Sequence, residues 1–106
     1  MTQVNQIEAD EILEIFNKKN ESIFFIDVRD PEELEEGTIP NINKISWNEF
    51  PKYIENLDKN KKYIIVCNTG AKSNRGAEIM LKQGFSDVSS FSGGMLSWYE
   101  NDYPLA

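Results

Sequence analysis

The sequence predicts an α/β fold: a small, mostly parallel five-stranded sheet with helices on both faces. Segments with apolar residues at helical spacing alternate along the chain with short apolar runs of strand type. Two of those runs are apolar almost throughout, which is typical of strands buried on both faces of a parallel sheet. The chain has 106 residues and no Pro- or Gly-rich linker, so one domain over residues 1–106 is expected.

The elements expected from these patterns are, in chain order, a helix over 9–16, a strand over 22–28, a helix between 30 and 37, a weaker strand over 42–47, a short helix over 48–57, a strand over 62–67, a helix over 73–83, a strand over 87–91 and a helix over 95–101. The first helix is predicted because Ile12, Ile15 and Phe16 share one face. Lys18 and Lys19 are expected in its last turn, where cations are favourable.

The remaining elements follow from apolar content and capping residues. The strand over 22–28 combines aromatic and β-branched residues. Asp30 as N-cap and Pro31 at the first position predict the next helix, which Gly37 ends. In the helix over 73–83 a face of Ala77, Met80 and Leu81 is apolar, and Gly84 supplies a left-handed C-terminal residue.

Composition excludes several classes of function. Eighteen acidic and eleven basic residues give a net charge of −7, and the chain contains no His and one Cys. The lack of His excludes a His-based zinc site, a Ser-His-Asp triad and a His general base. A single Cys excludes an internal disulfide and a multi-thiolate metal centre. The acid excess argues against nucleic acid and anionic membranes as partners. It lies in residues 1–60, which carry fourteen acids and six bases, whereas residues 61–106 carry four acids and five bases.

The cellular location expected for the chain is the cytoplasm. The first five residues show neither a basic region nor an apolar core of signal-peptide type. No window approaches the ~18 apolar residues that a membrane span needs. A lone free thiol suits a reducing compartment.

The chemistry is expected at Cys67, the last residue of the most apolar strand. Ligands of parallel sheets bind outside the carboxyl ends of the strands. A small polar loop follows, in which Gly70 permits unusual backbone angles, and then a helix begins. The sulfur would face backbone N–H groups and the positive helix end, which favour a thiolate. Such a thiolate is a nucleophile without a general base, although a Cys can also serve as a small buried hydrophobe.

The sequence of this loop does not match either of two known anion-binding motifs. The segment 70–73 resembles the end of a nucleotide P-loop, but Ala71 precedes Lys72 and the first glycine of that motif is absent. A Cys-x5-Arg phosphatase loop needs Arg at position 73, where this chain has Ser73. The loop therefore argues against phosphatase or arsenate-reductase-like chemistry.

Three blocks resemble the single-domain rhodanese family, the thiosulfate sulfurtransferases, over nearly the whole chain from about Ile7 to Pro104. The blocks are 25–34 followed by 37–40, 67–73, and 93–98 followed by 103–104. They look like the family's N-terminal signature, its active-site loop with the nucleophilic Cys first, and its C-terminal signature. The resemblance implies a rhodanese-like fold over residues 1–106.

The resemblance also implies a two-step sulfur transfer. The thiolate of Cys67 attacks the sulfane sulfur of a small anionic donor, such as thiosulfate or a persulfide, and is left as a persulfide. A thiol acceptor then takes the outer sulfur; the acceptor can be a small thiol, a thiol protein or, in an assay, cyanide. The implied substrate-binding residues are Asn68, Thr69, Gly70, Ala71, Lys72 and Ser73. Asp27 and Arg29 are implied to support the loop, and neither a metal nor an organic cofactor is implied.

The chain departs from the family pattern at two positions. Thr38 stands where the family usually has His, and Lys72 stands where the loop usually ends in Arg. Lys keeps the charge but lacks the planar two-pronged donor that fits an oxyanion, which leaves the preferred donor open. A sulfur-carrier or redox-sensing module that acts on a partner protein is the alternative hypothesis.

The last block contains two glycines and aromatic residues. Gly93 and Gly94 are expected to permit close backbone packing rather than to bind a ligand. Trp98, with Trp47 and Phe91, is expected in the core or the wall of a pocket.

Overall fold

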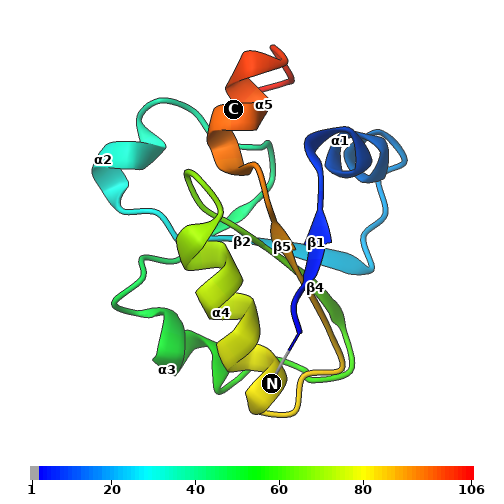
Figure 1. Ribbon diagram of the computed structural model, residues 1–106, viewed down its shortest axis with the longest axis vertical. Helices are drawn as coiled ribbons and strands as arrows, with labels where there is room; N and C mark the ends of the chain where they lie inside the picture. Colours follow the sequence, from blue (N-terminus) through cyan, green and yellow to red (C-terminus); the bar gives the residue numbers. More distant parts are fainter. Residues whose placement is uncertain (1–2) are drawn as a thin grey trace.

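The computed structural model describes residues 3–106, which form a five-stranded, all-parallel sheet with helices on both faces (Figure 1). The elements are β1 (Asn5–Ile7), α1 (Ala9–Asn17), β2 (Ile23–Asp27), α2 (Pro31–Leu34), β3 (Asn43–Lys44), α3 (Phe50–Ile54), β4 (Lys62–Val66), α4 (Ala71–Lys82), β5 (Asp87–Phe91) and α5 (Gly94–Glu100). The strand order across the sheet is β1-β5-β4-β2-β3. The predicted fold class is confirmed.

Each face of the sheet has its own hydrophobic core. Phe50 of α3 and Met80 of α4 pack on one face, against Tyr63 and Ile65 of β4. The side chains between them on β4, Ile64 and Val66, point to the other face, which α1 and α5 cover. Both sets are buried, and burying one such side chain contributes about 1.5–3 kcal/mol. This two-sided burial explains why the strand is apolar at every position after Lys62.

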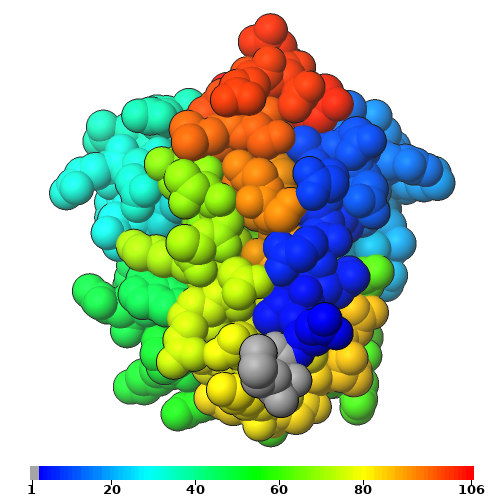
Figure 2. Space-filling view, in the orientation of Figure 1, coloured from blue at the N-terminus to red at the C-terminus, as the bar shows by residue number. Residues whose placement is uncertain are grey.

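The strand β1 is absent from the elements that the sequence predicts. Only one of its three residues, Ile7, is buried, so the segment carries almost no strand pattern. It becomes a strand by pairing with β5, from Asn5 opposite Ser89 to Ile7 opposite Phe91. Figure 2 shows the N-terminal segment lying against α4 on this side of the molecule, where the Gln6 amide donates to Asn74 at 2.7 Å.

The other edge strand is shorter than predicted. The strand expected over 42–47 is reduced to β3, which pairs with β2 only at Asn43 and Lys44. One further bond, from the Ile45 N–H to the Asp27 carbonyl at 2.9 Å, ends the pairing. The chain then turns, and the Phe50 N–H donates to the Ser46 carbonyl at 3.0 Å as α3 begins. The pairing thus ends where the chain turns into α3, whose Phe50 is buried in the core of one face.

Several helix ends differ from the predicted ones. The helix α2 ends at Leu34, before Gly37, and α3 spans Phe50–Ile54 rather than 48–57. The helix α1 ends at Asn17, so the prediction that Lys18 and Lys19 lie in its last turn is wrong; Lys19 has φ of +52° where the chain reverses toward β2. Asp30 and Pro31 begin α2 as predicted, with a capping box completed by Glu33. The helix predicted over 73–83 begins two residues earlier, at Ala71. None of the helices within residues 3–106 is long and apolar enough to cross a membrane.

Candidate active site at Cys67

The sulfur of Cys67 lies inside a tight loop at the carboxyl end of β4. Its Sγ accepts hydrogen bonds from the backbone N–H of Gly70 at 3.1 Å and of Ser73 at 3.2 Å. Ser73 is in the first turn of α4, a helix of 12 residues, so the sulfur lies at the positive end of that helix. The side chain is 3% exposed. Backbone N–H groups aimed at the sulfur stabilise negative charge on it.

A buried hydroxyl pair continues from the sulfur into the sheet. The Ser73 Oγ lies 3.4 Å from the Cys67 Sγ and 2.7 Å from the Oγ of Ser90 on β5. Both serines are fully buried. The Ser73 hydroxyl accepts from the thiol, and when the sulfur is a thiolate the same hydroxyl can rotate to donate to it. Ser90 is not among the residues predicted from the sequence, although a polar pair inside an otherwise buried strand is a signal of this kind.

The loop is held from outside by the start of α5. The N–H of Met95 donates to the Cys67 carbonyl at 2.8 Å, and the N–H of Leu96 donates to the Asn68 carbonyl at 3.1 Å. These bonds satisfy loop carbonyls with free N–H groups of the first helical turn. Gly94 makes the approach possible because its backbone has φ of +61° and lies directly on the loop. The expected close packing at this glycine is confirmed.

Replacing Gly94 with alanine is expected to weaken both stability and Cys67 reactivity. A Cβ there would overlap the Asn68 carbonyl oxygen, and it would lie 2.5 Å from the carbonyl carbon and 2.8 Å from the Thr69 nitrogen. A left-handed non-glycine residue costs about 1–3 kcal/mol, and the overlap also displaces the loop. Urea unfolding and the alkylation rate of Cys67 measure the two effects.

The matched control is Gly84→Ala. Gly84 follows α4 with φ of +98°, but its Cβ would meet only the Lys59 side chain, at 3.8 Å. This variant is expected to lose stability while it keeps the alkylation rate of Cys67. Equal alkylation rates in the Gly94 and Gly84 variants would contradict the role assigned to Gly94.

A hollow of about 290 Å³ opens beside Cys67. Its lining residues come from the loop, the start of α4 and the region of α2: Arg29, Glu33, Cys67, Asn68, Thr69, Ala71 and Lys72. The other two residues predicted to bind substrate, Gly70 and Ser73, contact the Cys67 sulfur through their backbone N–H groups. Within residues 3–106 the Lys72 ammonium has no carboxylate within 4.0 Å. The structure therefore brings the six residues predicted to bind substrate together with the Cys67 sulfur.

Asp27 and Arg29 form a buried ion pair at the end of β2. The Arg29 guanidinium contacts the Asp27 carboxylate at 2.9 Å, and both side chains are at most 1% exposed. The same guanidinium donates to the Glu33 and Gly37 carbonyls and to the Tyr99 hydroxyl. Burial disfavours the charged guanidinium, but hydrogen bonds and the charge of Asp27 outweigh burial and raise the pKa of Arg29 above its ordinary value. The pair thus connects β2, α2 and α5 around the hollow.

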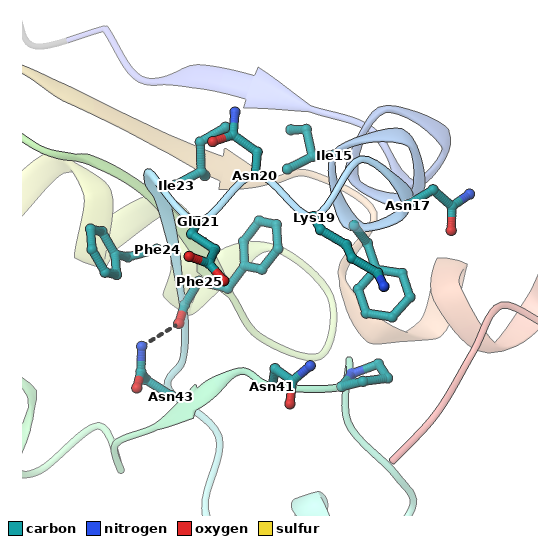
Figure 3. Close-up of a pocket in the computed structure, with 12 residues that line it drawn as sticks. Ile15, Asn17, Lys19, Asn20, Glu21, Ile23, Phe24, Phe25, Asn41 and Asn43 are labelled. Atoms are coloured by element: carbon teal, nitrogen blue, oxygen red, sulfur yellow. Dashed lines mark hydrogen bonds between the residues drawn. The ribbon is translucent and has the colours of Figure 1, made fainter.

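A larger hollow, of about 600 Å³, lies at the opposite end of β2 (Figure 3). Phe24 and Phe25 of β2 and Ile15 of α1 contribute apolar surface, and Asn41 and Asn43 lie along its lower side. The Asn43 amide donates to the Phe25 carbonyl at 3.3 Å. Its ionisable residues are Lys19 and Glu21, and no cysteine, serine or threonine of residues 3–106 lines it. The candidate active site is therefore chosen by the positioned sulfur of Cys67 and not by the size of the hollow.

Comparison with known proteins agrees with this geometry. The model of the rhodanese-like domain family matches residues 8–101. The chain belongs to the rhodanese-like domain family. The match includes every residue that lines the hollow, from Arg29 and Glu33 to the Cys67 loop and the start of α4.

Rhodanese-like relatives cover nearly the same length. A thiosulfate sulfurtransferase, GlpE of Coxiella burnetii, is 33% identical over 96 residues, which is 91% of this chain and 85% of that protein. A sulfurtransferase of Allochromatium vinosum is 24% identical over 102 residues, 96% of this chain and 94% of that protein. The crystal structure of a rhodanese-related protein from Thermoplasma volcanium superposes with a TM-score of 0.84 at 29% identity and covers 96% of this chain and 97% of that one. These likenesses support a sulfurtransferase family and a transferase role.

Proposed function

We propose that this protein transfers sulfane sulfur from a donor such as thiosulfate to a thiol acceptor through a persulfide on Cys67. The observation that carries the proposal is the position of the Cys67 sulfur, which accepts two backbone N–H bonds at 3.1 and 3.2 Å on the floor of an open hollow. A sulfur held in this way can bear negative charge without a general base, and the chain contains no His to act as one.

The transfer takes two displacement steps on sulfur. In the first, the Cys67 thiolate forms a bond to the outer sulfur of thiosulfate, the S–S bond of the donor breaks, and its electron pair leaves with sulfite. In the second, an acceptor thiolate forms a bond to the outer sulfur of the persulfide, and the Cys67 thiolate is the leaving group. The N–H groups of Gly70 and Ser73 stabilise the charge on Cys67 before the first step and after the second.

Lys72 supplies the cation of the site in this proposal. It lies in the first turn of α4 beside the hollow, where its ammonium can receive the anionic end of a donor. Asn68, Thr69 and Ala71 contribute uncharged wall from the same loop. A cytoplasmic location is part of the proposal because a single reduced thiol suits that compartment.

Mass spectrometry of the protein after incubation with thiosulfate tests the proposal. The expected product is heavier by one sulfur atom, located on the peptide that contains Cys67, and subsequent addition of a thiol removes that atom. The control is the same protein with Cys67 alkylated beforehand, which is expected to gain nothing. An unchanged mass, or sulfur on another residue, would contradict the proposal.

Comparison of two sulfur donors distinguishes a sulfurtransferase from the alternative role on a partner protein. A sulfur carrier or redox-sensing module would gain little sulfur from thiosulfate and would load rapidly from a persulfidated protein. Fast loading by thiosulfate with catalytic turnover favours the sulfurtransferase. Thiocyanate release in the presence of cyanide measures that turnover.

A further inference from the structure

Two side chains of opposite charge lie in the hollow beside Cys67. Glu33 and Lys72 both line it. Within residues 3–106, neither side chain lies within 4.0 Å of a group of opposite charge. Both remain available to a bound molecule, and they differ in sign.

The third charged residue of the hollow, Arg29, is already fully engaged. All five of its N–H groups are directed at acceptors: the Asp27 carboxylate, the Glu33 and Gly37 carbonyls, and the Tyr99 hydroxyl. The Asp27 carboxylate at 2.9 Å balances its charge. Arg29 therefore provides neither a free donor nor a net positive charge to a ligand.

Glu33 is held in place at the edge of the hollow. Its Oε1 accepts from the Asp30 N–H at 3.2 Å, and its carbonyl accepts from Arg29 at 3.2 Å. The side chain is half-buried. Residues 30–36 contain five carboxylates and no base, so the potential around Glu33 is negative. This wall attracts an ammonium group.

We propose that the hollow selects amino-acid thiols and their persulfides, with Glu33 receiving the ammonium group and Lys72 the carboxylate. This inference rests on the proposed persulfide chemistry and names its preferred acceptor class. In the step concerned, the thiolate of the amino acid forms a bond to the outer sulfur of the Cys67 persulfide. The bond between that sulfur and Cys67 breaks, Cys67 leaves as thiolate, and the amino acid leaves as a persulfide.

Single-turnover transfer to matched thiols tests the proposal. The protein is loaded with thiosulfate, desalted and mixed with cysteamine, cysteine, 3-mercaptopropionate or 2-mercaptoethanol. Each rate constant is divided by that for 2-mercaptoethanol, so that the general reactivity of the variant cancels. Glu33→Gln is expected to lower the ratios for cysteamine and cysteine about twofold to fivefold, the range of one partly exposed ion pair. It is expected to raise the ratio for 3-mercaptopropionate, while Lys72→Met lowers the ratios for 3-mercaptopropionate and cysteine.

The matched control is Glu32→Gln, which removes the same charge one residue away, on an exposed position outside the hollow. Glutamine at position 33 keeps an acceptor for the Asp30 N–H, so α2 retains its capping box. Unchanged ratios in Glu33→Gln, or an equal fall in Glu32→Gln, would overturn the proposal.

Alkylation of Cys67 separates this proposal from the persulfide mechanism. The ratio of its rate with 2-bromoethylamine to its rate with iodoacetamide is expected to fall about twofold to fivefold in Glu33→Gln, and the ratio for iodoacetate is expected to rise. This readout needs no sulfur transfer. If no persulfide forms but the alkylation ratios change as expected, the proposed sulfur transfer is wrong and the charge selection stands. If the persulfide forms and the alkylation ratios do not change, only the charge selection is wrong.

Discussion

Replacing Cys67 with serine is expected to reduce thiocyanate formation from thiosulfate and cyanide by more than about a thousandfold, as removal of a covalent nucleophile usually does. The serine oxygen would lie among the same N–H groups, but it would remain a hydroxyl. The partners of the sulfur are two backbone N–H groups and the Ser73 hydroxyl, and none of them is a base that would remove a proton. The chain contains no His. Steady-state thiocyanate release and the intact mass after thiosulfate treatment measure the loss.

The loss of activity in Cys67→Ser must be separated from unfolding. The side chain is 3% exposed and serine differs little in size, so a small change in melting temperature is expected. Circular dichroism and thermal unfolding provide the control. Thiocyanate formation at more than a few per cent of the wild-type rate in a folded Cys67→Ser protein would rule out Cys67 as the nucleophile.

Replacing Arg29 with methionine is expected to produce the largest loss of stability, about 3–5 kcal/mol. The change leaves the Asp27 carboxylate at 0% exposure without its counter-charge. It also leaves the Glu33 and Gly37 carbonyls without their guanidinium donors. For a domain of this size, each kcal/mol corresponds to about 4–8 °C in melting temperature. Urea unfolding and differential scanning calorimetry measure the effect.

A double variant distinguishes the buried charge from general loss of packing. Combining Arg29→Met with Asp27→Asn removes the isolated carboxylate, and part of the lost stability is expected to return. A loss below about 1 kcal/mol in Arg29→Met, or no recovery in the double variant, would show that the ion pair is not what holds this end of β2.

The Cys67 loop is predictable because the residues that build it are close in sequence. Cys67 and its two N–H donors lie within seven consecutive residues, between an apolar strand and a helix. Strand, loop and helix start are each specified by local pattern, so the amino-acid sequence is enough to place their junction. The main difference is that α4 begins at Ala71, two residues before the predicted start.

Residues far apart in sequence account for the features that the sequence does not predict. The strand β1 has one buried residue, and only its pairing with β5, more than 80 residues away, makes it a strand. The hydroxyl of Ser90 reaches Ser73 from a separate strand. Glu33 is one of five carboxylates between residues 30 and 36, and nothing in that segment distinguishes the one that lines the hollow.

The sequence by itself determined the α/β class, most helices and strands, and the Cys67 loop, because hydrophobic periodicity, capping residues and loop composition act over a few neighbouring residues. Tertiary structure alone decided which groups meet at that loop. It aimed the Met95 and Leu96 N–H groups at the loop carbonyls and used every donor of Arg29 inside the fold. It also placed Glu33 and Lys72 in the hollow with no oppositely charged group of residues 3–106 within 4.0 Å of either side chain. The physical reason is that hydrogen bonds and charges act through space at short range, and only packing of both cores onto the sheet brings these distant residues within that range.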